Sequence, residues 1–193
     1  MESYEESYLE RRPQRLCHMC GRCCRVATTT VSYEKLQELA KQNDKGAVDF
    51  LTIFTPYDSI EDARKVDAQI VDNIINRLKG DNNYDEKETT FYYCKYIQPN
   101  NLCSKYESRL DLCVHCPSTP WVVVPPGCGF EGWLFWEREE IKRKVRGYKE
   151  ELLDMMVLRS KTTDEELLKK IAAVEAKLHE NIDMYQKYGA HDW

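Results

Sequence analysis

The chain has 193 residues, a mass of 22.8 kDa, a formal charge of −5 and an isoelectric point near 5.5. This length suits one domain of ordinary size, alone or with an appendage. The acidic balance argues against non-specific nucleic-acid binding, which needs a basic surface, and a hydrophobic fraction of 42% argues against disorder throughout. Cysteine is the outlier, because all nine lie between Cys17 and Cys128.

The N-terminal segment lacks the basic region and the apolar run of a secretory signal. The longest apolar run, 121–124, is far shorter than the roughly 20 residues of a membrane span. We therefore expect a cytoplasmic protein with no membrane partner. In a reducing compartment, clustered cysteines serve more often as metal ligands or redox groups than in disulfides.

The first two thirds of the chain predict short elements. Residues 1–12, acidic and then basic, are expected to form a flexible N-terminus. Periodic apolar residues predict helices over 33–41 and 47–54 and a longer one between the cap residue Ser59 and Gly80, which lies just past its end. Runs of β-branched and aromatic residues predict short strands within 26–31, 89–97 and 121–124. The turn signal at 99–101 predicts a hairpin that brings Cys94 near Cys103.

From Trp136 onward, cysteine and proline disappear and charged residues dominate. Apolar residues recur at steps of three and four over 137–159 and over 164–187, and Thr163-x-x-Glu166 has the spacing of a capping box. Two helices packed as an antiparallel hairpin are predicted.

The predicted fold is a mainly α-helical α+β protein. A cysteine-rich metal-binding domain with short strands is expected over 13–136, followed by the helical hairpin over 137–193. The hairpin offers a surface for a protein partner, and the sequence does not indicate an oligomeric state.

The strongest motif is Cys17-x-x-Cys20-Gly21-x-Cys23-Cys24. A two-residue spacer lets successive thiolates face one metal or cluster, as in zinc fingers and iron–sulfur loops. Gly21 lets the chain wrap tightly and lets backbone amides approach the sulfurs. Because the adjacent Cys23 and Cys24 side chains diverge, either two neighbouring centres or one buried non-ligand cysteine is expected.

The remaining cysteines follow in a second, more widely spaced set: Cys94, Cys103, Cys113, Cys116 and Cys128. The Cys113-x-x-Cys116 pair repeats the chelating spacing. Two four-cysteine sites would use eight thiolates and leave one. Thiolates suit both zinc and iron–sulfur clusters, while the compact 17–23 spacing matches the first three ligands of a bacterial ferredoxin loop.

Polar residues near these cysteines are candidates for supporting roles. Because His18 and His115 lie inside the two-residue spacers, we expect them to point away from a bound metal. Tyr106-x-x-Arg109 precedes Cys113, where a guanidinium would offset the negative charge of clustered thiolates. An ordinary surface salt bridge to a neighbouring acid is the alternative for Arg109.

Together these motifs resemble the YkgJ-type cysteine-cluster family. The resemblance is carried by Cys17-His-Met-Cys20-Gly21-Arg-Cys23-Cys24, then Cys94 and Cys103, then Tyr106-Glu-Ser-Arg109 and Cys113, and it spans roughly 16–130. It implies a zinc- or iron-chelating domain and no assigned reaction. The chain departs from the family at Leu110, where proline is usual.

The sequence therefore predicts an iron–sulfur protein with one or two 4Fe-4S clusters that performs redox or cluster-dependent chemistry in the cytoplasm. The alternative is a structural zinc module whose hairpin binds a protein partner. A metal-dependent enzyme with an open coordination position stays a third possibility. The predicted metal ligands are Cys17, Cys20, Cys23, Cys24, Cys94, Cys103, Cys113, Cys116 and Cys128, supported by Gly21, Tyr106 and Arg109.

Overall fold

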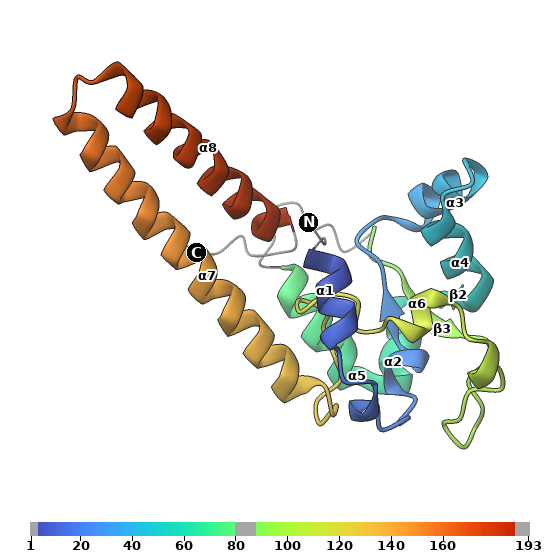
Figure 1. Cartoon of the computed structure of the whole chain (residues 1–193). Helices are drawn as coiled ribbons and strands as arrows, with labels where there is room; N and C mark the ends of the chain where they lie inside the picture. Colours follow the sequence, from blue (N-terminus) through green and yellow to red (C-terminus); the bar gives the residue numbers. More distant parts are fainter. Residues whose placement is uncertain (1–3, 80–87, 188–193) are drawn as a thin grey trace. The chain divides into compact units, whose positions relative to one another are not determined.

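The computed structural model describes residues 4–79 and 88–187 (Figure 1). The fold is mainly helical, with a small antiparallel sheet and a C-terminal helical hairpin, which confirms the predicted class. The helices are α1 (Tyr4–Arg11), α2 (Arg22–Arg25), α3 (Tyr33–Lys41), α4 (Lys45–Ile53), α5 (Ile60–Leu78), α6 (Asp111–Val114), α7 (Glu131–Lys161) and α8 (Glu165–Lys187), with short 3-10 turns η1 (Gln14–Leu16) and η2 (Tyr106–Ser108). The strands are β1 (Ala27–Thr28), β2 (Phe54–Pro56) and β3 (Phe91–Cys94).

The chain divides into two compact units. The cysteine-rich unit comprises 1–118 and 122–131, and the hairpin unit comprises 119–121 and 132–193. The sequence predicts a flexible segment over 1–12, but Tyr4–Arg11 forms a helix. Tyr8 is buried, and its hydroxyl donates a hydrogen bond to the Pro117 carbonyl at 3.2 Å. The N-terminal helix therefore belongs to the folded cysteine-rich unit, because its aromatic side chain is part of the packed interior.

Strand β3 is the centre of the sheet, antiparallel to β1 on one side and to β2 on the other. Successive side chains of a strand point to opposite faces. Phe91 accordingly packs with the apolar face of α5, and Tyr92 packs with residues of α3 and α4. This arrangement places Cys94, the last residue of β3, at the end of a strand that is held on both faces.

Polar caps fix where the helices of this unit begin. The side chains of Ser32, Asp44 and Ser59 each accept a hydrogen bond from the backbone amide three residues further on. The predicted helix over 33–41 is confirmed residue for residue, and the helix predicted between Ser59 and Gly80 is confirmed as α5, Ile60–Leu78. The hairpin predicted around the turn at 99–101 is confirmed too, since the backbones of Ile97 and Cys103 pair across it.

Two details of the predicted secondary structure are wrong. Residues 121–124 form no strand, because Pro120 and Pro125 on either side lack the amide hydrogens that a ladder needs. The sequence also ends a helix at Phe54, whereas Phe54 begins β2 and lies opposite Cys94. Tertiary pairing with β3 overrides the local helical periodicity there.

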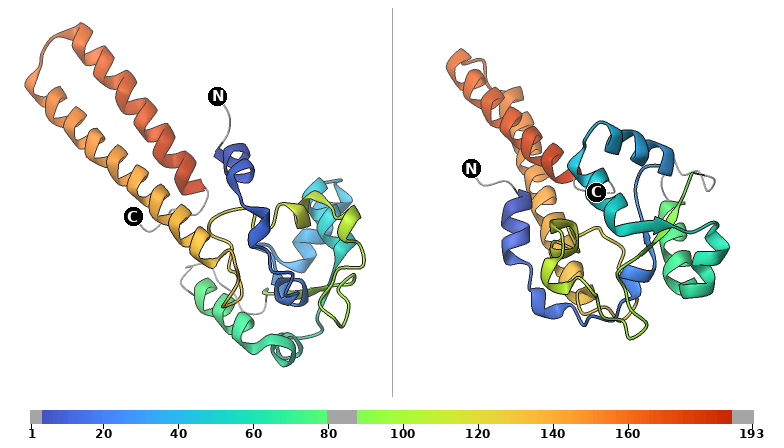
Figure 2. Two further views of the ribbon diagram at one scale, coloured as in Figure 1. Left: turned by 60° about the horizontal axis from the view of Figure 1, so that its bottom comes forward. Right: turned by 90° about the vertical axis from the view of Figure 1, so that its right-hand side faces the viewer.

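In the hairpin unit, α7 and α8 run antiparallel (Figure 2). The Tyr148 and Tyr185 rings stack with centroids 6.2 Å apart, and Arg159 pairs with Glu175 at 3.1 Å. Asp164 caps α8 by accepting from two backbone amides, in place of the predicted Thr163. None of the described helices combines the length and apolarity needed to cross a membrane.

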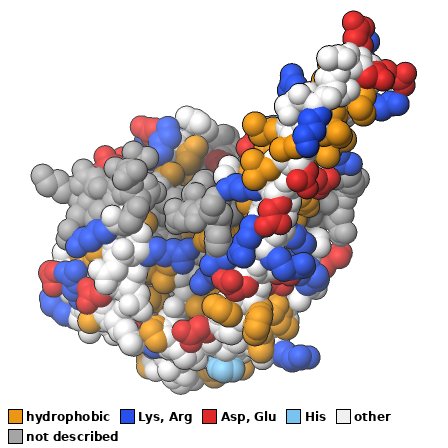
Figure 3. Space-filling model, turned by 90° about the vertical axis from the view of Figure 1, so that its left-hand side faces the viewer, with side chains coloured by type: hydrophobic (Ala, Val, Ile, Leu, Met, Phe, Trp, Pro, Cys, Tyr) orange, Lys and Arg blue, Asp and Glu red, His pale blue; other side chains and the backbone are white. Residues whose placement is uncertain are grey.

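The hairpin unit also keeps apolar side chains exposed. Figure 3 shows hydrophobic side chains at its surface between lysine, arginine and acidic residues. The exposed apolar residues of the second half of α7 include Leu153, Met156 and Val157.

Candidate metal centre

The cysteines of the unit gather in two neighbouring groups, and all nine are free thiols. The inner group, whose thiols interact electrostatically with one another, consists of Cys24, Cys94, Cys103 and Cys113. The outer group, linked by the same kind of interactions, consists of Cys17, Cys20, Cys23, Cys116 and Cys128. The groups meet at the adjacent Cys23 and Cys24, whose thiols are hydrogen-bonded to each other.

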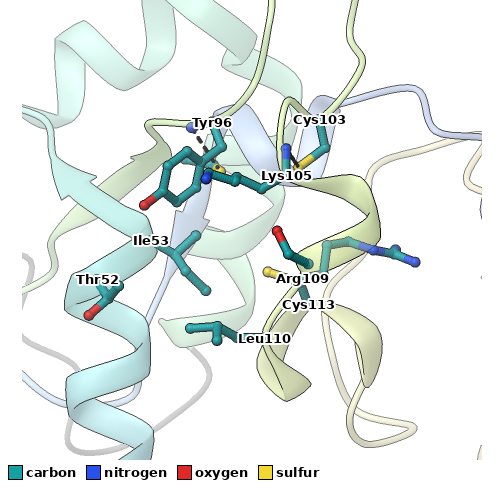
Figure 4. A pocket seen from close by; sticks show the side chains of 10 residues that line it. Thr52, Ile53, Tyr96, Cys103, Lys105, Arg109, Leu110 and Cys113 are labelled. Atoms are coloured by element: carbon teal, nitrogen blue, oxygen red, sulfur yellow. Dashed lines mark hydrogen bonds between the residues drawn. The ribbon is translucent and has the colours of Figure 1, made fainter.

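Three cysteines of the inner group line a cavity of about 180 Å³ (Figure 4). Cys94, Cys103 and Cys113 line it together with the apolar side chains of Ile53 and Leu110. Burial raises the pKa of the Cys94 thiol and raises that of Cys113 to about 11. Both thiols are therefore protonated at neutral pH when no cation is present, and metal binding there would have to displace protons.

Backbone amides donate hydrogen bonds to sulfurs in both groups. The amide of Tyr96 donates to Cys94 and the amide of Lys105 donates to Cys103, each at 3.4 Å (dashed lines in Figure 4). The Phe130 amide donates to Cys128 and favours its thiolate, although burial raises the pKa of that thiol overall. In all three cases the donor lies two residues after the cysteine. Such bonds orient a sulfur ligand and stabilise its negative charge.

The Cys17–Cys24 loop of the outer group wraps through two left-handed residues. Met19 has φ 49° and Gly21 has φ 73°, a region that side chains rarely adopt. A Cβ on Gly21 would also lie 3.0 Å from the Asn101 Cβ. Gly21 therefore permits both the tight turn that the sequence predicts and the close approach of this loop to the 97–101 turn. Its support of a bound cofactor stays a prediction.

Cys128 is held beside the same loop by the glycine that follows it. A Cβ on Gly129 would lie 2.1 Å from the Leu16 carbonyl oxygen and 2.7 Å from Nε2 of His18. Since no side chain fits there, glycine is required for the two segments to approach. His18 consequently packs against the Gly129 backbone.

The predicted pair Tyr106 and Arg109 lies next to the inner group. The Arg109 guanidinium carbon is 3.8 Å from the centroid of the Tyr106 ring, and Nε donates to the Tyr106 carbonyl at 3.0 Å. Its charge lowers the pKa values of Cys24 and Cys113, against the larger opposing effects of hydrogen bonding and burial. Among the described side chains Arg109 forms no ion pair, and Asp111 pairs with Lys45 instead.

A second arginine, Arg12, lies near the cysteines and was not predicted from the sequence. Arg12 is only 5% exposed, and its Nη2 donates to the Val114 carbonyl at 2.6 Å. It interacts electrostatically with Cys17 and Cys116 of the outer group. No sequence signal marks it, because its partner is 102 positions away in the chain and the segment around it predicts a flexible end.

The arrangement suits a thiolate-bound centre in its chemistry. Sulfur donors from separate segments, with amide hydrogens directed at three of them, are the ligand set of zinc and iron–sulfur sites. Within 4–79 and 88–187, no three Cys, His, Asp or Glu side chains already stand in an arrangement that encloses an ion.

Comparison with models of known families, with curated proteins and with solved structures finds no match to this chain. The likeness to the YkgJ-type family accordingly rests on the cysteine, tyrosine and arginine motifs alone.

Proposed function

We propose that the cysteine-rich unit binds inorganic centres through cysteine thiolates, with iron–sulfur clusters as the preferred occupants, and that the protein serves redox or cluster-dependent chemistry. One observation carries this proposal: nine free thiols from distant segments converge in two groups that meet at Cys23 and Cys24. Cys23 and Cys24 are adjacent in the chain but belong to different groups. This arrangement suits two centres that lie next to each other.

The number of cysteines in each group supports two centres. The inner group has the four thiols of a complete tetrahedral or cubane site. The outer group has five, which is one more than such a site needs. We place the protein in the cytoplasm, because free thiols in this number persist in a reducing compartment.

Iron–sulfur clusters are preferred to zinc for two reasons. The compact 17–23 spacing matches a ferredoxin loop, and the motifs resemble a family described as zinc- or iron-chelating. The alternative, a structural zinc module whose hairpin binds a protein partner, draws support from the exposed apolar residues Leu153, Met156 and Val157 of α7.

Anaerobic purification followed by metal and sulfide analysis tests the proposal. We expect a brown protein that contains iron and acid-labile sulfide. A colourless protein with stoichiometric zinc would establish the structural alternative. A reduced, folded protein that retains neither metal would contradict both.

Matched ligand variants test the division into two groups. Cys113→Ser removes one of the four inner thiols. Cys17→Ser combined with Cys20→Ser removes two of the five outer thiols, so that fewer than four remain there. Each of these two variants is expected to lower the bound metal by about half, since each opens one four-ligand site, and the variant that carries all three substitutions should lose nearly all of it. Equal and complete loss in the inner variant and in the outer variant would indicate one shared centre instead.

A further inference from the structure

Arg12 is a buried cation whose hydrogen bonds are incomplete. Its Nη2 donates to the Val114 carbonyl, but Nε and Nη1 are buried and have no hydrogen-bond partner within the described part of the chain. A guanidinium carries five N–H donors and stays charged in proteins. Burying such a group without an anion is strongly unfavourable, so a structure that keeps one normally provides a negative partner.

Among the side chains that the structure describes, no carboxylate acts on Arg12 as this partner. In the described residues, the titratable groups that act on it are Tyr8, Cys17, Cys116 and Arg109. Arg109 is a second cation and repels it. The Tyr8 hydroxyl is a hydrogen-bond donor to the Pro117 carbonyl. This leaves the thiols Cys17 and Cys116, both members of the outer group, as the sources of negative charge.

We propose that Arg12 is the counter-cation of the centre held by the outer group, and that its Nε–H and Nη1–H donate hydrogen bonds to the sulfur ligands of that centre. This inference rests on the proposed function. A centre with four thiolate ligands is anionic whether it is an iron–sulfur cluster or zinc, so one buried guanidinium serves either occupant. Arg109 has the corresponding place beside the inner group.

This role makes the effect of Arg12 depend on whether metal is bound. In the loaded protein, Arg12 offsets the charge of the centre and helps to retain it. In the metal-free protein, the same guanidinium is an uncompensated buried charge. An arginine that served only to hold the Val114 carbonyl would instead contribute equally to both forms.

The experiment compares wild-type protein with Arg12→Met, each in metal-loaded form and in reduced, metal-free form. We expect Arg12→Met to release its metal at a chelator concentration roughly 10–100-fold lower than wild type, as for other residues that support metal ligands. In the metal-free form, we expect its urea midpoint to stay unchanged or to rise. Equal decreases of the urea midpoint in both forms, with unchanged metal retention, would overturn the inference.

Arg11→Met is the matched control. Arg11 is the neighbouring residue, exposed, with Nε donating to the Ser7 carbonyl of its own helix, so the substitution removes the same charge at the surface. We expect it to leave metal retention unchanged. If Arg12→Met does not fold, Arg12→Lys and Arg11→Lys replace the pair. Arg12→Lys keeps the positive charge but loses the several N–H donors of the planar guanidinium. It should therefore release metal more readily than Arg11→Lys. Equal release by the two variants would overturn the inference.

Metal analysis of the wild type separates the two possible failures. A wild type that retains no metal would contradict the proposed function and this inference with it. A wild type that retains metal, together with an Arg12→Met variant that retains it equally well, would contradict the role of Arg12 alone.

Discussion

Arg22 and Asp67 form a bidentate ion pair that connects the Cys17–Cys24 loop to helix α5. Nε and Nη2 of Arg22 donate to the two carboxylate oxygens of Asp67 at 2.6 and 2.9 Å. Asp67 has non-helical backbone angles inside α5, so the contact with Arg22 lies at a kink of this helix. Nη1 of Arg22 also donates to the Pro126 carbonyl at 2.9 Å. One guanidinium thus connects three segments, two of which carry cysteines of the outer group.

Removing the carboxylate should destabilise the unit. Asp67→Ala leaves the half-buried Arg22 without its main partner, and we expect the free energy of unfolding to fall by about 2 kcal/mol, the usual effect of losing hydrogen bonds to charged groups. Asp72→Ala is the matched control. Asp72 also lies in α5 and pairs with an arginine, Arg64, but its side chain is 53% exposed. Its effect should stay below about 0.5 kcal/mol. Equal losses in urea unfolding would contradict the importance of the Arg22 pair.

The same pair predicts how stability depends on pH. The hydrogen bond from Arg22 holds the pKa of Asp67 below its ordinary value. The folded protein therefore binds fewer protons here than the unfolded chain, so this stabilisation is present above the unfolded pKa of about 4 and is lost as the pH falls through the lower folded pKa. Between pH 6 and 2, wild type should lose more stability than Asp67→Asn. Parallel pH profiles in thermal unfolding would contradict this.

The close approach at Gly129 should be sensitive to a single methyl group. Gly129→Ala would place a Cβ 2.1 Å from the Leu16 carbonyl oxygen, so the Cys128 segment must move away from the Cys17 segment. We expect a loss of about 2 kcal/mol of stability, typical of overpacking, together with weaker metal retention. Both can be followed by urea unfolding and by competition with a chelator.

Gly46→Ala provides the control for that substitution. Gly46 lies within α4 of the same unit, and its added Cβ would make only ordinary contact, with Asp44 at 3.4 Å. Alanine in a helix is favoured over glycine, so the control should gain roughly 0.5–1 kcal/mol. A Gly129→Ala variant that behaved like this control would show that the two segments do not need their close approach.

The helices were predictable from the sequence because their signals are local. Ser32 and Ser59 cap their helices by accepting from amides three residues away, and apolar periodicity marks the buried face. The short strand β2 was not predictable, since Phe54–Pro56 becomes a strand only by pairing with β3, about 40 residues further along the chain. Tertiary pairing of this kind leaves no trace in a short window of sequence.

The sequence names the cysteines of the candidate site, but it indicates neither their grouping nor the buried Arg12. Sequence spacing assigns Cys24 to the run 17–24, whereas the structure groups it with Cys94, Cys103 and Cys113. The same holds for Cys116, which forms a hydrogen bond with Cys23 although sequence spacing pairs it with Cys113. Only the folded chain decides which thiols become neighbours, because each group draws on segments that are distant in the sequence.

The raised pKa of Cys113 predicts its reactivity in the reduced, metal-free protein. Burial raises this pKa to about 11, so little thiolate is present at pH 8. Unfolding in urea should return the pKa to about 8.5 and accelerate alkylation of Cys113 by iodoacetamide roughly 100-fold. Cys17, which is exposed in the folded protein, should gain much less. Peptide mass spectrometry after timed labelling gives both rates, and similar gains at the two cysteines would contradict the burial of Cys113.

Leu110 stands where the resembled family usually has proline, and its backbone is already compatible with that residue. Its angles are φ −69° and ψ 159°, close to the fixed φ of proline, and Arg109 before it is extended, as a residue that precedes proline prefers. The stabilisation expected from a compatible proline is roughly 0.4–1 kcal/mol, and loss of the partly exposed leucine side chain opposes it. Leu110→Pro should therefore change the free energy of unfolding by less than about 1 kcal/mol.

The control for that substitution is His115→Pro, five residues further on. The His115 amide donates to the Asp111 carbonyl at 2.7 Å, so proline there removes a hydrogen bond at the end of α6 and should cost about 3 kcal/mol. Urea unfolding of the two variants separates a compatible backbone from an incompatible one within the same short segment. Comparable losses in both would mean that the backbone at Leu110 does not have the conformation that accepts proline.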